Sequence, residues 1–184
     1  MGQEKQVNTG TGLLVVYTGD GKGKTTAALG MCVRASGYDW KIAIVQFVKG
    51  DWKYGELEGI KLLGPNIELE VVGEGCVGIC GDKKPLAVHK KAARDGLEKA
   101  TEKIASGEYG LVILDELNVA LSLKLVDRKQ VEKLLEVCRP GQHLVITGRG
   151  APEWLLDRAD LVTEMKEIKH PFKAGLMAQK GIDF

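Results

Sequence analysis

The chain has 184 residues, 44% of them hydrophobic and 28% charged, and its 26 basic and 25 acidic residues give a formal net charge of +1. This length and composition exclude a disordered chain and favour a single domain over residues 1–184, with residues 1–12 as a flexible N-terminal arm. The near-zero charge argues against a protein that coats nucleic acid, because such proteins are usually strongly basic. The longest apolar stretches, residues 13–17 and 111–114, are far shorter than the roughly 20 residues that span a bilayer, so no membrane association is expected.

The polar N-terminus and the cysteines bear on the cellular location. Residues 1–12 lack the apolar segment of a secretory signal, so we expect a cytoplasmic protein. Cysteines in that compartment stay reduced, and we expect this of Cys32, Cys76, Cys80 and Cys138. Cys76 and Cys80 lie four residues apart, which falls short of a four-ligand zinc site and favours a plain reduced loop.

Short runs rich in Val, Ile and Leu alternate with longer segments of helical period along the chain. This alternation is typical of βαβ units, so we predict an α/β fold of three layers, with helices on both faces of a mostly parallel sheet. Buried strands are expected at Leu13–Thr18, Lys41–Phe47, Ile67–Val72, Leu111–Asp115, His143–Thr147 and Leu161–Glu164.

The segments between these strands carry apolar stripes that predict helices. A first helix is expected at Ala27–Ala35. In the segment after Pro85, one face is formed by Leu86, Ala93, Leu97, Ala100 and Ile104. Another stripe consists of Val131, Leu134, Leu135 and Cys138, which makes Cys138 a core-facing helical residue. The glycine-rich residues Gly73–Pro85 are expected to form a long loop, and such loops often carry function.

A glycine-rich segment directly follows the first strand and carries phosphate-binding chemistry. It consists of Gly19, Asp20, Gly21, Lys22, Gly23, Lys24, Thr25 and Thr26. The order of strand, glycine loop and helix is that of a P-loop, in which backbone N–H groups and the helix N-terminus bind phosphates. Lys24 is expected to reach the outer phosphates, and the Thr25 hydroxyl to bind Mg²⁺.

The spacing of this loop departs from the usual pattern. The first glycine would fall at Thr18, whereas here it is Gly19, so we interpret the loop as a variant. The alternative is that these glycines form a tight turn without a binding function. The Gly-Lys-Thr-Thr ending, placed between a strand and a helix, argues against that alternative. Nucleotide binding is therefore the prediction from these residues.

Residues 111–116 add a second nucleotide-site element. Four apolar residues deliver Asp115 and Glu116 to the carboxyl edge of the sheet, as in a Walker B element. Asp115 is expected to hold Mg²⁺, directly or through water. Glu116 occupies the position of a water-activating base in many P-loop ATPases, but a glutamate in the first turn of a helix is also favoured by the helix dipole alone.

Further motifs follow in order along the chain and give it a family resemblance. They are residues 45–50, 54–56, 114–118, 146–150, 169–175 and 178–184. Together with the shifted glycine loop, they resemble the P-loop family of ATP:cob(I)alamin (corrinoid) adenosyltransferases. The resemblance covers nearly the whole chain.

The resemblance implies a RecA-like P-loop fold, usually a homodimer, that transfers the 5′-deoxyadenosyl group of ATP to the cobalt of a reduced corrinoid. Triphosphate leaves, and ATP lies reversed so that its C5′ faces the cobalt nucleophile, which makes a protein nucleophile unnecessary. It also implies a flavoprotein electron donor, ATP binding by residues 19–25, and a position near Mg²⁺ for the pair Asp115 and Glu116. Arg149, in a turn after a strand, either contacts a phosphate or is a surface arginine.

Two departures from the enteric members of that family concern the corrinoid. Only twelve residues precede the first strand, so the N-terminal helix that covers the corrinoid is expected to be missing or reduced. The loop Gly73–Pro85 lacks the aromatic residues that displace the lower corrinoid ligand, which leaves Val77 or Ile79 for that role, or a different handling of the corrinoid. Trp52 and Tyr54 either line the corrinoid face or anchor their loop.

Two other functions remain open from the sequence. One is a P-loop ATPase or kinase that breaks a phosphoanhydride bond, because the same loop serves many reactions. The other is a nucleotide-dependent module that binds and delivers a corrinoid without catalysis. Reaction products distinguish the three.

Overall fold

The computed structural model describes residues 10–50, 54–75, 77–78 and 81–184. Within them, one parallel sheet has the strand order β3-β2-β4-β5-β1-β6. The strands are β1 (Leu14–Thr18), β2 (Ile42–Gln46), β3 (Ile67–Val71), β4 (Leu111–Asp115), β5 (His143–Thr147) and β6 (Leu161–Glu164). Each end lies within one residue of the prediction, and the expected parallel α/β sheet is confirmed.

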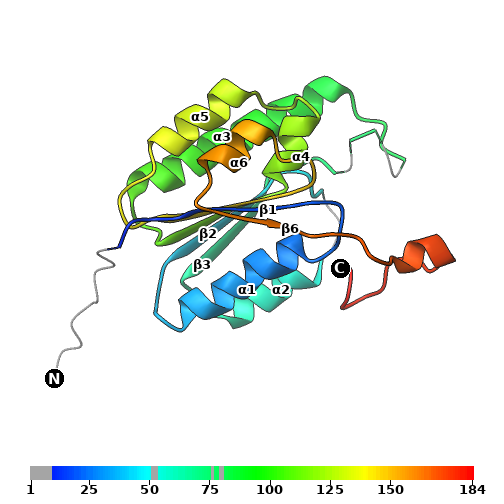
Figure 1. Ribbon diagram of the computed structural model, residues 1–184, viewed down its shortest axis with the longest axis horizontal. Helices are drawn as coiled ribbons and strands as arrows, with labels where there is room; N and C mark the ends of the chain where they lie inside the picture. Colours follow the sequence, from blue (N-terminus) through cyan, green and yellow to red (C-terminus); the bar gives the residue numbers. More distant parts are fainter. Residues whose placement is uncertain (1–9, 51–53, 76, 79–80) are drawn as a thin grey trace.

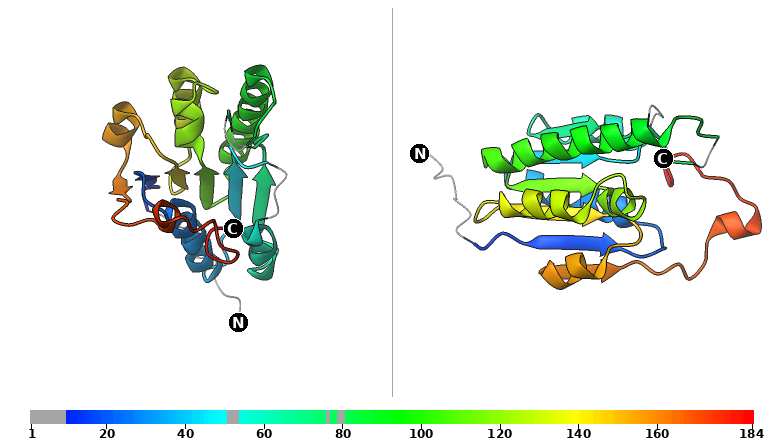
Figure 2. Two further views of the ribbon diagram at one scale, coloured as in Figure 1. Left: turned by 90° about the vertical axis from the view of Figure 1, so that its right-hand side faces the viewer. Right: turned by 90° about the horizontal axis from the view of Figure 1, so that it is seen from above.

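Helices cover both faces of this sheet and form the outer layers (Figures 1 and 2). They are α1 (Lys24–Ser36), α2 (Gly55–Leu62), α3 (Leu86–Ser106), α4 (Leu117–Ser122), α5 (Arg128–Glu136), α6 (Glu153–Arg158) and the short 3₁₀ helix η1 (Pro171–Ala174). The first two lie below the sheet in Figure 1, and α3 to α6 lie above it. The three-layer prediction is therefore confirmed.

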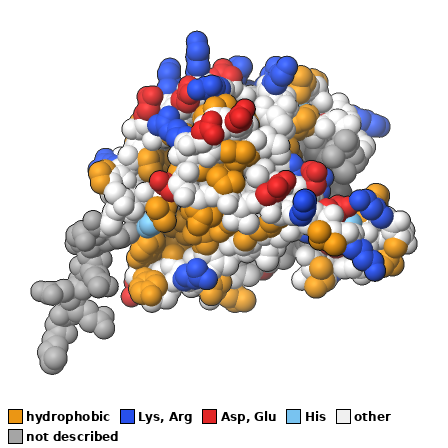
Figure 3. Space-filling model, viewed as in Figure 1, with side chains coloured by type: hydrophobic (Ala, Val, Ile, Leu, Met, Phe, Trp, Pro, Cys, Tyr) orange, Lys and Arg blue, Asp and Glu red, His pale blue; other side chains and the backbone are white. Residues whose placement is uncertain are grey.

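The strands bury their side chains because helices pack on both faces of the sheet. Every residue of β2 and β4, the strands inside the sheet that carry the Ile- and Val-rich runs, is buried. The prediction of a buried strand is wrong for the two outermost strands. All residues of β6 are exposed, with Leu161 and Val162 each 43% accessible, and in β3 four residues are half-buried and Val71 is exposed. The cause is the position of these strands at the edges of the sheet. Figure 3 shows apolar side chains along the β6 edge, below a helical layer of mixed charge.

Three helix predictions need correction. The first helix begins at Lys24, directly after the glycine loop, rather than at Ala27. Leu86 is 49% exposed because it opens α3, ahead of the turns that pack on the sheet. Cys138 is not helical, because α5 ends at Glu136; its half-buried thiol lies beside the Gln142 side chain.

The segment after β6 returns to the carboxyl edge of the sheet. It first runs beside the glycine loop, where Met165 N–H donates to the Thr18 carbonyl at 2.8 Å. It then extends outward through η1, and the last residues turn back to lie near the start of α1 (Figures 1 and 2). None of the helices in the described part of the chain combines the length and hydropathy needed to cross a bilayer.

Candidate active site

A cavity of about 570 Å³ opens at the carboxyl edge of the sheet, between the N-terminal ends of α1 and α2. Its wall includes most of the residues that the sequence predicts to bind the nucleotide: Gly21, Lys22, Gly23, Lys24, Thr25, Thr26, Glu116 and Arg149. Gly19 and Asp20 precede this wall at the start of the loop, and Asp115 lies beneath it with 1% of its surface accessible. The predicted residues thus converge on one place.

The glycine loop turns through backbone conformations that other residues rarely adopt. Gly19 has φ 92° and Gly23 has φ 106°, both in the left-handed region. Gly21 lies against the segment after β6: its N–H donates to the Met165 carbonyl at 2.7 Å, and a Cβ there would be 2.7 Å from the same oxygen. The prediction that successive loop amides face phosphate is therefore wrong for Gly21.

Lys24 is held inside this loop rather than extended into solvent. It is 6% exposed, and its ammonium donates to the carbonyls of Gly19 at 2.7 Å and Gly21 at 2.6 Å. Burial lowers the pKa of Lys24, and the Glu116 carboxylate opposes that shift. A buried ammonium bound to two carbonyls keeps a positive charge at the start of α1, where anions bind.

Asp115 joins three strands and α1 through hydrogen bonds. Its Oδ1 accepts from the hydroxyls of Thr25 at 2.8 Å and Thr147 at 2.7 Å. Its Oδ2 accepts from Gln46 Nε2 at 3.1 Å and lies 3.7 Å from the Lys49 ammonium. These contacts fix the carboxylate at the bottom of the cavity. Gln46 and Thr147 were not predicted as site residues, although each is a polar residue that ends a buried apolar strand, and that signal could have identified them.

Glu116 follows with a strained backbone, at φ 63° in the left-handed region, and precedes α4 rather than lying in its first turn. Its amide donates to the Thr147 hydroxyl at 2.9 Å, and its side chain lines the cavity. Burial raises the pKa of Glu116, and the neighbouring Asp115 charge raises it further. Such a conformation at a cavity wall is typical of functional positions.

Lys49 and Glu56 are site residues that sequence analysis named only within motifs. They form an ion pair between the connection after β2 and the first turn of α2, and both line the cavity. The Lys49 ammonium also lies 4.7 Å from the ring centroid of Tyr54, which therefore lies at the nucleotide cavity. The sequence did not predict α2, the helix that carries Glu56. Among its residues Ile60 is the one that is buried, and a single buried residue produces no apolar stripe in the sequence. Trp52 lies outside the described residues.

The donors around Asp115 fit a magnesium ion. Mg²⁺ prefers oxygen ligands and is held in phosphate sites by one or two carboxylates together with substrate oxygens. The Thr25 hydroxyl and the Asp115 carboxylate lie within 2.8 Å of each other, and Glu116 lines the same cavity. Across the described ranges, no group of three or more His, Cys, Asp or Glu residues could hold a metal. In P-loop sites, substrate phosphate and water supply the remaining ligands.

A family model described as ATP:corrinoid adenosyltransferase BtuR/CobO/CobP matches residues 10–184. The chain belongs to this family. A corrinoid adenosyltransferase from Pseudomonas aeruginosa is 39% identical over 94% of this chain and 84% of its own length. Proteins of the same description from a Sinorhizobium species and Escherichia coli are 42% and 37% identical, also over 94% of this chain, and over 80% and 86% of their own. The prediction of an ATP-dependent corrinoid adenosyltransferase is confirmed.

A solved structure supports the predicted fold of this adenosyltransferase. The flagellar accessory protein FlaH from Methanocaldococcus jannaschii superposes with a TM-score of 0.51 over 84% of this chain and 71% of its own, at 15% identity. At that identity the likeness concerns the fold alone. Together with the parallel sheet and the glycine loop, it confirms the RecA-like P-loop fold.

The described part of the loop Gly73–Pro85 is held by the half-buried Asp82, which pairs with the buried His89 of α3. Asp82 accepts from the amides of Gly78 and Lys84, each at 3.0 Å, and lies 2.9 Å from Nε2 of the buried His89. Val77, one of the residues considered for displacing the corrinoid ligand, packs against the main core. The other, Ile79, and both loop cysteines lie outside the described residues.

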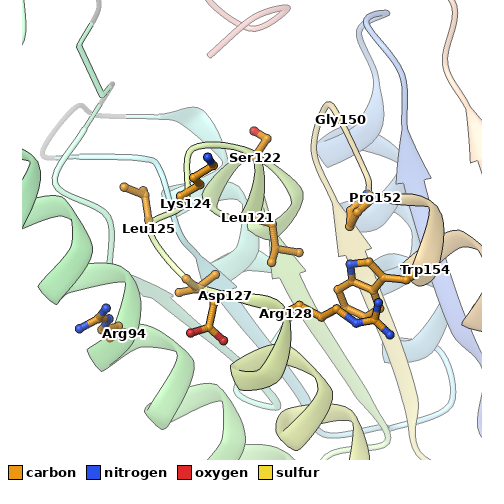
Figure 4. A pocket seen from close by; sticks show the side chains of 11 residues that line it. Arg94, Leu121, Ser122, Lys124, Leu125, Asp127, Arg128, Gly150, Pro152 and Trp154 are labelled. Carbon is orange, nitrogen blue, oxygen red and sulfur yellow. The ribbon is translucent and has the colours of Figure 1, made fainter.

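A second cavity, of about 390 Å³, lies beyond the turn that carries Arg149 (Figure 4). It is lined by residues from α3, the connection between α4 and α5, and the start of α6. Two of the lining residues contact each other, because the Arg128 guanidinium lies 5.1 Å from the ring centroid of Trp154. None of the predicted nucleotide-binding residues lines this second cavity, whereas most of them line the larger one.

Proposed function

We propose that this chain transfers the 5′-deoxyadenosyl group of ATP to the cobalt of a reduced corrinoid, and that residues 19–26 hold the triphosphate that leaves. The observation that carries the proposal is the cavity in which the glycine loop, Asp115 and Arg149 meet, in a chain of this family. In this reaction the reduced cobalt attacks C5′, and the bond between C5′ and the triphosphate oxygen breaks with its electron pair on the triphosphate.

The residues of the site stabilise the charge that grows on the leaving group. Lys24 supplies a fixed positive charge beside the loop, and Arg149 and Lys49 add two more, from the turn after β5 and the connection after β2. Thr25 and Asp115 would hold Mg²⁺, with Glu116 nearby. When bound, Mg²⁺ offsets the charge of the triphosphate. The cobalt is the nucleophile, so the protein's task is to bind and orient ATP.

The proposal extends to the working form of the protein, on the strength of the family resemblance. The chain acts as one nucleotide-binding domain in a cytoplasmic homodimer, and a reduced flavoprotein supplies the electron that generates the cobalt nucleophile. The exposed apolar edge at Leu161 and Val162 is compatible with a partner subunit. Sedimentation at several protein concentrations tests the dimer.

Product analysis tests the reaction. The protein is incubated with ATP, Mg²⁺ and chemically reduced cobalamin, and the corrinoid spectrum and the phosphate products are followed together. The proposal requires adenosylated corrinoid and triphosphate in equal amounts. ADP formed without corrinoid would instead indicate an ATPase or kinase, and tight corrinoid binding without a cobalt–carbon bond would indicate a delivery module.

A further inference from the structure

The last four residues of the sequence form part of the wall of the nucleotide cavity. Gly181, Ile182, Asp183 and Phe184 line it together with the glycine loop. Figure 2 shows this segment folded back over the carboxyl edge of the sheet, next to α1 and α2. On the α2 side, a Cβ at Gly55 would lie 3.7 Å from the carbonyl carbon of Phe184. The segment therefore bridges the two helices that flank the cavity.

Asp183 organises this segment, which we call the C-terminal turn (residues 179–184). Its carboxylate accepts the Gln179 amide at 2.7 Å, and its own amide donates to the Gln179 carbonyl at 2.8 Å. The Gly181 amide donates to the Phe184 carbonyl at 2.8 Å. The side chain and the backbone of Asp183 thus both bond to Gln179, and a further backbone hydrogen bond closes the end of the turn.

The same carboxylate ties the turn to the glycine loop. Asp183 forms an ion pair with Lys22, and its side chain is 10% exposed whereas that of Lys22 is 46% exposed. The hydrogen bond from Lys22, followed by that from the Gln179 amide, lowers the pKa of Asp183. The Asp183 carboxylate contacts both Gln179 within the turn and Lys22 in the glycine loop. Removing this carboxylate should therefore release the turn from the loop.

The chemistry of the turn suits the nucleoside part of ATP rather than the triphosphate. The positive charges for phosphate lie on Lys24, Lys49 and Arg149, and the acid of the turn would repel a polyphosphate. The turn instead offers apolar surface: Ile182 is 79% exposed and Phe184 is 41% exposed, although both line the cavity. Exposed apolar side chains at a cavity wall gain by covering the flat, partly apolar surface of an adenosine.

We propose that the C-terminal turn contacts the adenosine of ATP, and that Asp183 is the positioning residue that holds the turn against Lys22 for this purpose. The inference rests on the proposed function, because it takes ATP as the ligand of the cavity. The inference assigns a binding position to the 5′-deoxyadenosyl group that the reaction transfers. The glycine loop holds the part of ATP that leaves, and the turn holds the part that is kept.

Binding measurements with two ligands distinguish the contribution of the C-terminal turn from that of the glycine loop, and they require no catalytic turnover. Calorimetry on the full chain with Mg²⁺ measures the affinity for ATP and for inorganic triphosphate, which lacks the adenosine. Asp183→Asn should weaken ATP binding about tenfold, the effect of losing one charge-assisted contact, and change triphosphate binding by less than twofold. Asp183→Glu, which keeps the charge, should restore most of the ATP affinity. The matched control is Asp157→Asn on α6, the same chemical change on an exposed residue away from the cavity.

A second variant tests the contact surface itself. Ile182→Ser removes apolar surface and leaves the Asp183 carboxylate in place, so it should again weaken ATP binding and spare triphosphate binding. Equal losses for both ligands would overturn the inference, since the turn would then merely support the glycine loop. Unchanged affinity for ATP in both variants would overturn it as well. These results are independent of the corrinoid assay, so a failure of adenosyl transfer is recognised separately.

Discussion

The hydroxyl of Thr25 donates to Oδ1 of Asp115 at 2.8 Å, although the two residues are 90 positions apart in the sequence. This contact brings the start of α1 and the end of β4 together at the bottom of the cavity. A hydroxyl and a carboxylate so placed are the two protein ligands that a P-loop site offers to Mg²⁺. The relationship therefore links the glycine loop to the acidic element at one cavity, where we propose that the triphosphate binds.

Asp115→Asn tests this link through the magnesium requirement. The amide keeps the size of the side chain but loses the negative charge, so the magnesium concentration for half-maximal adenosyl transfer should rise roughly 10- to 100-fold. A magnesium titration at saturating ATP measures this shift, and thermal unfolding reports whether the buried contacts to Thr25 and Thr147 survive. An unchanged magnesium dependence in a folded variant would contradict the assignment of Asp115.

Lys24→Ala should reduce kcat/KM roughly 100- to 1,000-fold, because a fixed positive charge beside the leaving group is lost. The substitution also leaves the carbonyls of Gly19 and Gly21 without the ammonium that bridges them, so a modest fall in Tm is expected. Lys24→Arg should restore little activity, since a planar guanidinium does not replace a compact ammonium in this loop. Lys129→Ala, at an exposed position on α5 away from the cavity, is the control. Near-normal turnover of Lys24→Ala would count against the loop assignment.

Gly21→Ala tests the packing of the glycine loop against the segment after β6. The new Cβ would lie 2.7 Å from the Met165 carbonyl and 2.8 Å from backbone atoms of Lys166, so the loop must shift. We expect weaker ATP binding and a lower Tm. Gly30→Ala on α1 is the matched control, because nothing lies within 4 Å of its Cβ position. In a helix interior that change should stabilise the protein by about 0.5–1 kcal/mol. If Gly21→Ala and Gly30→Ala had the same ATP affinity and the same Tm, the proposed packing of Gly21 against the segment after β6 would be refuted.

The thiols provide a fourth prediction, on a Cys76→Ser, Cys80→Ser double variant. Its activity should remain close to that of the unchanged protein, as expected of a plain reduced loop. Burial raises the pKa of Cys32 to about 12 and also raises that of Cys138. Both remaining thiols should therefore react very slowly with iodoacetamide at mildly alkaline pH, and both should react after unfolding. Mass spectrometry counts the labels. Loss of turnover in the variant would instead indicate a role for the loop thiols.

Local sequence patterns were sufficient to predict the strands and the glycine loop of this protein. The six strands were predictable because short Val- and Ile-rich runs suit positions covered on both faces, and the phosphate loop because Gly19 and Gly23 need left-handed backbone in a fixed order with Lys24 and Thr25. The same patterns could not show that β6 lies at an exposed edge. A strand's neighbours depend on the order of strands in the sheet, which a run of residues does not encode.

The surroundings of the phosphate loop were decided by the tertiary structure. Gln46, Thr147 and Lys49 surround Asp115 because β2, β4 and β5 are neighbours whose carboxyl ends meet at one edge. Asp183 reaches Lys22 because the chain beyond β6 turns back across that edge. The sequence by itself determined which residues could bind a phosphate. The tertiary structure decided which side chains complete the cavity around them. These side chains meet through contacts between distant segments, and the energies of such contacts depend on the packed fold and produce no periodic pattern in the sequence.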